Sequence, residues 1–487
     1  MPPVLSPSRS FWLSSLAPAQ HAALNSRSTA ALPEKVPIVV LGAGMSGVSV
    51  AYHLAQRGRG ADTLLLDARC VAGGASGRNG GQIKPISVWE LGGVARQHGV
   101  LRALQLWRHE AQNRHAIRRL VNRHAIDCDL ERDIDCVQLY PGTAAGLRAW
   151  REKAWPAADS ALVQWVLALV GGPRVWDADA CASELALRGG GGGGGGGDGG
   201  GGGGGPASNA IGAGLALLDG AADTFSCAKF CAGLVDEARR AGVNVQPHTR
   251  VLRIERASDD DDGGGGGGEI RVVTDRGTVR CERVVHCTNA WSAELLPQPF
   301  TQQIKPIRNH LISSAPAPPL RRPTTDPSSG GAAFGLHPGF SYWMQRRQDG
   351  RVVLGGFRNE VPGNEVGVRD DSEAGMSEDV LRVAKRFLRD VGFVGFAGGE
   401  VAIEHAWSGI IGWSCDNLPF VGPVPARPRE YVCAGFSGHG MTQTLLCGAA
   451  AADMVVGAQP SPQHCFMDAF LPDSARTGAP WDAGSPH

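Results

Sequence analysis

Apolar and polar positions near the start of the chain predict a strand, a turn, a helix and a second strand. Residues Ile38–Leu41 are all apolar, which is typical of a buried strand. Apolar residues then recur at helical spacing at Met45, Val48, Ala51, Tyr52 and Ala55. Leu64–Leu66 forms a second apolar run. This order is typical of an α/β domain with a parallel sheet.

The same reading predicts elements along the rest of the chain. Helical spacing indicates helices over Val100–His124, Ala144–Ala154, Ala228–Ala241 and around Val380, Val383, Ala384 and Phe387. Extended patterns indicate strands over Gln303–Ser313, Ser341–Gln345, Arg351–Gly356 and up to His286, and a hairpin of Val251–Arg256 with Glu269–Thr274. Two low-complexity blocks, Gly189–Gly205 and Ser258–Gly268, are expected to be flexible insertions because they cannot bury apolar surface.

The first turn, LGAGMSG, carries the chemistry of a dinucleotide site. Gly42 permits a tight turn, Gly44 lets the backbone approach a pyrophosphate, and Gly47 lets the helix pack close to the strand. The helix N-terminus offers unpaired N–H groups to the phosphates. Asp67 follows the second apolar run, where a carboxylate can accept hydrogen bonds from ribose hydroxyls. The segment predicts a bound dinucleotide but does not separate NAD from FAD.

Two further glycine turns favour the longer cofactor. The loop Gly73–Gly81 reads GGASGRNGG and can donate backbone N–H groups along a cofactor, with an ordinary surface turn as the alternative. Tyr431–Thr442 reads YVCAGFSGHGMT and precedes the apolar run Leu445–Val456, so it predicts another strand, turn and helix. A second helix N-terminus can face the far end of an extended cofactor. FAD is long enough to be held at both ends.

These segments resemble the FAD-dependent amine and amino-acid oxidases of the D-amino acid oxidase and sarcosine oxidase type. The matching motifs, in the family's order, are LGAGMSG, GASGRNGGQ, VNVQPHTRVLRIE, CTNAW, SYWMQRRQDGRVVLGG, WSGIIGWSCDNLPFVGP and GFSGHGM. The RNGG loop is most similar to the γ-glutamylputrescine oxidase-like branch. The resemblance implies an enzyme that oxidises the C–N bond of an amine or amino acid to an imine, with oxygen as the expected acceptor. A dehydrogenase that passes electrons to a carrier and a flavin-binding protein without turnover are the alternatives.

The resemblance also places the cofactor on named residues. The expected FAD contacts are Gly42, Ala43, Gly44, Met45, Ser46, Gly47, Asp67, Ala68, Arg69, Gly74, Ser76, Gly77, Arg78, Asn79, Gly80, Gly81, Val251, Asn289, Ala290, Trp291, Gly438, His439, Gly440, Met441 and Thr442. Some sarcosine oxidase-type relatives attach the flavin to a cysteine several residues before a Pro-Asp pair. Here Asp416 follows Cys415 and the earlier position, near Gly409, has no cysteine, so non-covalent FAD is expected.

Three residues are the candidates for chemistry. His439 can add a hydrogen-bond donor or take a proton from a bound ammonium, or it can simply cap the following helix. Arg308 can clamp a carboxylate or be an exposed structural arginine. Arg78 is a candidate contact of flavin or substrate. Trp407 and Trp413 can wall an apolar pocket, with plain core packing as the alternative.

The predicted fold class is α/β, with a discontinuous Rossmann-like FAD-binding domain and an α+β substrate domain on a mostly antiparallel sheet. The expected divisions are an arm over 1–35, the FAD-binding domain over 36–90, 210–292 and 405–460, the substrate domain over 91–209 and 293–404, and a tail over 461–487. The active site is expected between the two sheets.

Composition narrows the possible partners and compartments. Lys+Arg and Asp+Glu are both 47, so the net charge of zero gives no basis for nucleic-acid or anionic-membrane binding. No apolar run approaches a membrane span. The 12 cysteines show no metal or disulfide spacing, which favours no metal and a reducing compartment such as the cytoplasm. Residues 1–33 lack acidic side chains, as an organellar transit peptide does, although SFWLSSL favours the arm of cytosolic relatives.

Overall fold

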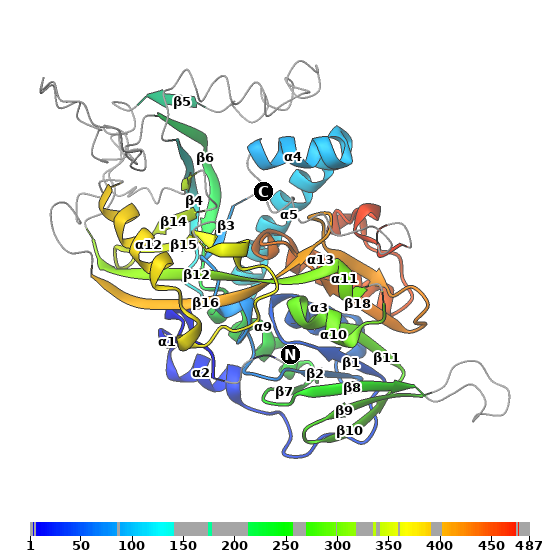
Figure 1. Cartoon of the computed structure of the whole chain (residues 1–487). Helices are drawn as coiled ribbons and strands as arrows, with labels where there is room; N and C mark the ends of the chain where they lie inside the picture. The colour runs from blue at the N-terminus through cyan, green and yellow to red at the C-terminus, as the bar shows by residue number, and fades with distance from the viewer. Residues whose placement is uncertain are drawn as a thin grey trace, which may run out of the picture.

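A computed structural model of the chain describes residues 3, 6–84, 88–140, 174–177, 213–256, 269–298, 300–317, 335–337, 341–358, 361–390, 402–473 and 476. The predicted helix over 144–154 and the two low-complexity blocks lie outside the described residues. Four sheets and the helices around them make up the described part (Figure 1). In this part, no helix combines the length and apolar character needed to cross a membrane.

The central sheet has six strands in the order β17-β18-β11-β1-β2-β7. Their bounds are β1 Ile38–Leu41, β2 Thr63–Leu66, β7 Asn244–Gln246, β11 Arg283–His286, β17 Phe420–Pro423 and β18 Glu430–Ala434. All neighbouring pairs are parallel except β17 and β18. The strands predicted at 38–41, before His286 and from Tyr431 are therefore confirmed, as is the α/β class.

Successive residues of the central strands pack into two different hydrophobic cores. Val39 and Leu41 pack toward a three-stranded sheet of β8 Val251–Arg256, β9 Ile270–Thr274 and β10 Gly277–Cys281. Ile38 and Val40 belong instead to the large core that contains the helices. This alternation follows from the period of two along a strand. The predicted hairpin of 251–256 with the strand up to Thr274 is confirmed as an antiparallel pair.

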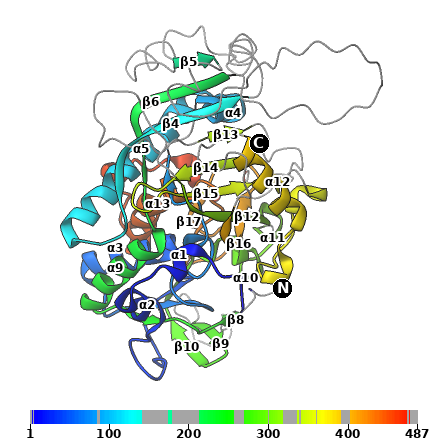
Figure 2. The same cartoon turned by 90° about the vertical axis from the view of Figure 1, so that its left-hand side faces the viewer.

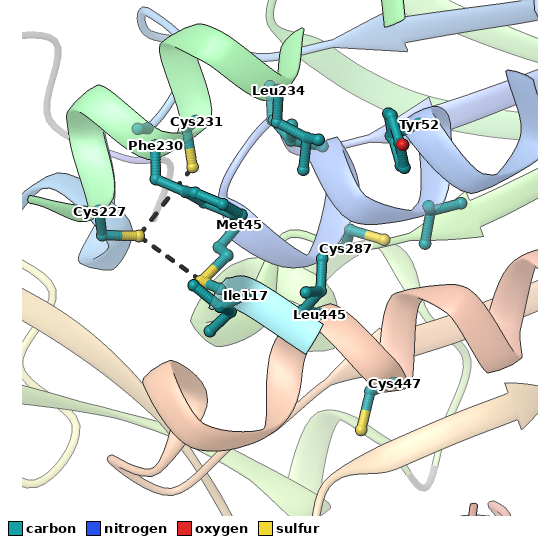
Figure 3. Close-up of a cluster of buried hydrophobic side chains, with 14 of the residues drawn as sticks. Met45, Tyr52, Ile117, Cys227, Phe230, Cys231, Leu234, Cys287, Leu445 and Cys447 are labelled. Carbon is teal, nitrogen blue, oxygen red and sulfur yellow. Dashed lines mark hydrogen bonds between the residues drawn. The ribbon is translucent and has the colours of Figure 1, made fainter. Parts of the chain in front are cut away.

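Three helices lie close together on the helical face of the central sheet: α3 Met45–Leu54, α9 Cys227–Arg240 and α13 Gly440–Val455. Figure 3 shows Met45 of α3 beside Cys227 of α9, whose sulfur atoms are 3.6 Å apart, and Leu445 of α13 nearby. Ser49 Oγ donates a hydrogen bond to the Leu445 carbonyl at 2.7 Å. The contact holds α3 and α13 side by side, and both begin at the cavity described below.

A second large sheet is antiparallel throughout, in the order β13-β14-β15-β12-β16. Its strands are β12 Ile304–Pro316, β13 Gly335–His337, β14 Ser341–Gln345, β15 Arg351–Gly356 and β16 Ile403–Ser414, with helix α12 Glu378–Asp390 packed on it (Figure 1). β14 and β15 have the predicted bounds. Residues 405–414 pair with β12, so they lie in this sheet rather than in the six-stranded one. We propose that the cofactor-binding part resumes after Ser414.

A further sheet, of four strands, lies next to the antiparallel sheet. Strands β3 Gln82–Ile83, β4 Glu131–Tyr140 and β5 Arg174–Asp177 all pair with β6 Ala213–Thr224 (Figure 1). β6 therefore belongs to a different sheet from β1 and β2, the strands next to the first glycine turn. Helix α5 spans Val100–His124, as predicted, and follows α4 Val88–His98. Short helices α10 Ser292–Leu295 and α11 Phe300–Gln303 precede β12.

The N-terminal segment is built into this fold. Its helices α1 Phe11–Ser14 and α2 Pro18–Asn25 place Phe11, Trp12 and Leu24 in the large core (Figure 2). Ser10 Oγ donates to the Gly77 carbonyl at 2.6 Å, and Trp12 Nε1 donates to the Asn79 carbonyl at 2.6 Å. The segment therefore supports the RNGG loop directly.

Candidate active site

A cavity of about 460 Å³ lies where the N-termini of α3 and α13 meet β12, β14 and β16. Its size is typical of a small-molecule or cofactor site. The predicted residues that line it are Gly42, Gly44, Met45, Ser46, Asp67, Ala68, Arg69, Gly74, Ser76, Arg78, Asn79, Gly80, Val251, Asn289, Trp291, Gly438, His439, Gly440, Met441 and Thr442. Three glycine turns far apart in sequence thus converge on one cavity.

The first turn is held around the carboxylate of Asp67. Asp67 Oδ2 accepts a hydrogen bond from Ala43 N at 2.7 Å, and Oδ1 accepts one from Arg69 N at 2.8 Å. Burial nevertheless raises the pKa of Asp67 to about 6, because removing the charge from water outweighs these bonds. Gly42 has φ +91° and lies so close to Cys287 O that a Cβ would be 2.7 Å away, so this turn requires glycine.

The RNGG loop is fixed mainly through Arg78, which is 3% exposed. Its Nη1 donates to the Ser408 carbonyl at 2.9 Å and to Ser8 Oγ at 3.2 Å, and its Nε donates to the Gly73 carbonyl at 3.1 Å. Burial lowers the pKa of Arg78 to about 10, which leaves it charged at neutral pH. The Arg78 side chain therefore joins the loop to β16 and to the N-terminal segment.

Arg69 makes a buried ion pair beside the same loop. Its Nη1 and Nη2 lie 2.8 and 2.9 Å from the two carboxylate oxygens of Asp371, which is fully buried. The guanidinium also lies 5.7 Å from the centre of the Trp291 ring, which lines the cavity. The segment between β15 and β16 thus orients the Arg69 side chain, which is close in sequence to Asp67.

The second turn is organised by Asn289 and leads into α13. Asn289 Oδ1 accepts from Gly435 N at 2.9 Å and from Phe436 N at 3.4 Å. His439 precedes α13, but its side chain makes no capping hydrogen bond to that helix. Its Nδ1 lies 3.2 Å from the Ser437 carbonyl oxygen, and the residue lines the cavity. His439 is therefore placed where it can meet a ligand.

Arg308 is not brought to the cavity. Its Nε and Nη2 bind the two oxygens of Glu365 at 2.6 and 3.2 Å, and Nη1 donates to the Asp370 carbonyl at 3.0 Å. The guanidinium is thereby engaged by the loop that follows β15, so the geometry gives no support to a substrate clamp at Arg308.

Five predicted cofactor residues also stand back from the cavity: Ala43, Gly47, Gly77, Gly81 and Ala290. Each packs behind the lining instead. A Cβ at Gly47 would lie 1.8 Å from Gly42 O, and one at Gly81 would lie 2.6 Å from the Trp12 ring, so these glycines allow close packing. We propose that these residues shape the turns and do not contact the cofactor themselves.

The lining includes Tyr342 and Trp413 of the antiparallel sheet and Arg358, which lies just beyond strand β15. Of these three, the sequence indicated only Trp413 as a wall of the pocket. Arg358 is 4% exposed and its Cζ lies 4.4 Å from the centre of the Trp413 ring. Burial lowers the pKa of Arg358 to about 10. Tyr342 accepts a hydrogen bond from Asn309 Nδ2 at 2.8 Å, and burial raises its pKa. Trp407, the other tryptophan considered, is core: its Nε1 donates to the Arg78 carbonyl at 3.0 Å.

Sequence comparison assigns this chain to a known family. The family model described as "FAD dependent oxidoreductase" (DAO) matches residues 37–454. The chain belongs to the DAO family of FAD-dependent oxidoreductases. It is 24% identical over 430 residues to the gamma-glutamylputrescine oxidoreductase of Escherichia coli (strain K12), covering 86% of this chain and 83% of that protein. The family resemblance, an enzymatic role and FAD as cofactor are thereby confirmed.

Solved structures of DAO-type enzymes share the fold. Glycine oxidase from Geobacillus kaustophilus superposes with a TM-score of 0.62 at 18% identity, covering 91% of this chain and 99% of that one. L-proline dehydrogenase from P. horikoshii gives a TM-score of 0.63 at 17% identity, covering 92% and 99%. The two neighbours differ in name as oxidase and dehydrogenase, so the fold leaves the electron acceptor open.

The residues around the cavity fit FAD. Three buried polar atoms of lining residues, Gln82 Nε2, Trp291 Nε1 and Thr444 Oγ1, have no hydrogen-bond partner within the described chain. Such atoms are costly unless a ligand or water satisfies them. Asp67 would hold the ribose, and the N-terminal turns of α3 and α13 would offer N–H groups to the phosphates and the flavin ring. When bound, FAD supplies hydride acceptance.

Proposed function

We propose that this FAD-dependent oxidoreductase oxidises the C–N bond of an amine or amino acid to an imine, which water then hydrolyses, and that oxygen reoxidises the flavin. One residue supports an amino-acid substrate most directly: Arg358, a buried cation that lines the cavity beside Trp413. A buried cation on the wall of a ligand cavity suits an anionic group on the ligand. The proposal is supported by the names of two similar proteins, a gamma-glutamylputrescine oxidoreductase and a glycine oxidase.

Two aromatic lining residues would orient the substrate, and a histidine would take a proton from it. Trp413 and Tyr342 provide aromatic walls against which the carbon next to the nitrogen can be held. A carboxylate bound at Arg358 would fix one end of the molecule through a charge-assisted pair. His439 would take a proton from a bound ammonium group. The ammonium must lose this proton before oxidation, because the imine forms with the electron pair of the neutral nitrogen.

The carboxylate preference is tested with matched substrates. An α-amino acid and the amine that lacks its carboxylate are compared in the wild type and in Arg358→Gln. Hydrogen bonds to charged groups contribute about 1.5–3 kcal/mol, so the KM for the amino acid should rise about tenfold to hundredfold. The KM for the amine should change little. Equal losses on both substrates would remove Arg358 as the carboxylate contact.

Arg351→Gln is the matched control for that test. Arg351 begins the same strand, β15, but pairs with Glu404 at 2.7 Å and does not line the cavity. The proposal requires this variant to keep the wild-type preference between the two substrates. A comparable shift in Arg351→Gln would show that the preference depends on charge in general and not on position.

Oxygen as the acceptor is tested by admitting air to the substrate-reduced protein. Rapid return of the flavin spectrum with formation of peroxide supports an oxidase. Slow return in air and rapid return with an artificial electron carrier would support the dehydrogenase alternative instead. A cytoplasmic location, the lack of a metal site and the lack of a nucleic-acid partner remain predictions from the sequence.

A further inference from the structure

Helix α5 carries a group of polar side chains that are fully buried. His109, Glu110 and Asn113 each have no exposed surface. Asn113 follows Glu110 by three residues and His109 by four, and these spacings place it on the same side of the helix as each of them. That side faces the first half of α13, the helix that begins at the cavity. Polar groups are rarely buried without hydrogen bonds. The hydrogen bonds of these side chains therefore show which segment they hold in place.

Glu110 and Asn113 bind the opening turns of α13. Glu110 Oε1 lies 2.9 Å from Thr442 Oγ1 and accepts a hydrogen bond from Gln443 Nε2 at 2.8 Å. Asn113 Oδ1 accepts from Leu446 N at 3.0 Å, and its Nδ2 donates to the Met441 carbonyl at 3.3 Å. These bonds fix the rotation and position of α13 relative to α5.

The contact reaches the cavity through a single side chain. Thr442 lines the cavity, and its hydroxyl lies between Glu110 Oε1 at 2.9 Å and the His439 carbonyl oxygen at 3.0 Å. Met441 and Gly440 line the same wall. Any displacement of Glu110 would therefore move the turn that carries His439.

Apolar side chains could pack α5 against α13 without the cost of burying a carboxylate. When the Thr442 hydroxyl gives its one proton to Glu110 Oε1 and not to the His439 carbonyl, two donors converge on that oxygen, which suits the ionised form of Glu110. The N-terminal end of α13 carries the positive end of the helix dipole, which further favours a negative charge there. That same negative charge lies behind the turn that would face the flavin, so it reduces the positive potential at the cavity.

We propose that Glu110 is a positioning residue for the flavin-facing turn and that its charge holds the reduction potential of the bound flavin down. Reduction places additional electron density on the flavin, and a buried negative charge close to it disfavours that change. Through Thr442, the same carboxylate orients the turn that binds the cofactor. This role rests on bound FAD but on no particular substrate. The role of Glu110 and the proposed reaction can therefore be confirmed or rejected independently of each other.

The test is a dye-equilibrium measurement of the flavin reduction potential in the holoprotein. Glu110→Gln keeps an acceptor oxygen for Thr442 and Gln443 but removes the charge. Its flavin should be easier to reduce by about tenfold or more in the two-electron equilibrium constant, a rise of about 30 mV or more. Asn113→Ala is the control, because it removes uncharged contacts to the same helix. It should lower thermal stability and leave the potential near that of the wild type.

An unchanged potential in Glu110→Gln, or an equal rise in Asn113→Ala, overturns the role of the charge. If Glu110→Gln does not yield a folded holoprotein, the pair Thr442→Val and Thr442→Ser decides. Valine cuts the link to Glu110, whereas serine keeps the hydroxyl. FAD binding about tenfold weaker in Thr442→Val than in Thr442→Ser supports the positioning role, and equal binding by the two variants rejects it.

Discussion

The ring of Tyr342 packs directly against Gly80, so that a Cβ on residue 80 would lie 2.5 Å from Tyr342 Cε2. Gly80 belongs to the RNGG loop and Tyr342 to strand β14 of the antiparallel sheet. A Cβ on Gly355, in strand β15, would lie 2.6 Å from the Tyr342 hydroxyl oxygen. Two glycines thus make room for one aromatic ring at the cavity, and the ring joins the loop to the sheet.

Gly80→Ala should lower the free energy of unfolding of the holoprotein by about 1–3 kcal/mol, because overpacking a close contact displaces the ring or the loop. Gly355→Ala crowds the same ring from another element and should have a similar effect. Thermal unfolding followed by flavin fluorescence measures both variants.

Gly93→Ala, on helix α4, provides the reference for these substitutions. Its Cβ would have its nearest neighbour at 3.9 Å, which is ordinary contact, so stability should not fall. Gly80→Ala and Gly355→Ala variants as stable as Gly93→Ala would show that the contact with Tyr342 tolerates a methyl group, and the packing argument would be lost.

FAD affinity should depend on pH through Asp67. The pKa of this carboxyl is raised to about 6 by burial, so it is ionised above pH 6 and protonated below. The ionised form is the better acceptor for ribose hydroxyls. If only that form binds well, the dissociation constant of FAD should be about tenfold higher at pH 5 than at pH 7.

Asp67→Asn separates this effect from general acid sensitivity. The variant should bind FAD more weakly at pH 7 and should lose the rise in dissociation constant between pH 7 and pH 5. Binding titrations of the apoprotein measure both quantities. The same steep pH dependence in Asp67→Asn would assign the effect to another group.

The sequence predicted the elements whose patterns are local. Val100–His124 and both strands of the 341–356 hairpin have their predicted bounds because helical spacing and alternation there are uninterrupted. The predicted domain boundary at residue 405 does not coincide with the boundary between the antiparallel sheet and the six-stranded sheet. β16 continues the antiparallel sheet to Ser414, and its partner β12 lies about a hundred residues earlier, which no local pattern reveals.

The site was predictable where backbone turns form it and less so where side chains from distant strands enter it. Glycine spacing located all three turns at the cavity. Arg308 and Arg358 could not be ranked from sequence, because their places depend on residues far along the chain. Arg308 is bound by Glu365 away from the cavity lining, and Arg358 lies on Trp413 at the cavity wall. The only sequence signal for Arg358 is its position just beyond a predicted strand.

The FAD should be released from acid-denatured protein into the supernatant. Among the described cysteines, Cys227 and Cys287 line the cavity, and both are buried. Burial raises the pKa of Cys287 well above its ordinary value, which disfavours the thiolate that flavin attachment would need. Absorbance of the supernatant and the precipitate after acid treatment measures the partition. Flavin that stays with the precipitate would establish a covalent link.

His439→Ala should retain FAD, because the backbone N–H groups and the dipole of α13 remain. Flavin reduction by a good substrate should be about a hundredfold slower or more if His439 accepts the ammonium proton, and the pH profile of reduction should lose one ionisation. Anaerobic stopped-flow absorbance measures the rate. Reduction as fast as in the wild type would leave His439 with a structural role only.

Anaerobic mixing of the holoprotein with a panel of secondary amines, polyamines and amino acids tests the central claim most directly. At least one member should bleach the flavin absorbance and yield the carbonyl product of imine hydrolysis, and members with a carboxylate should do so at lower concentration. A flavin that dithionite reduces but that no amine or amino acid bleaches would contradict C–N oxidation at this cavity.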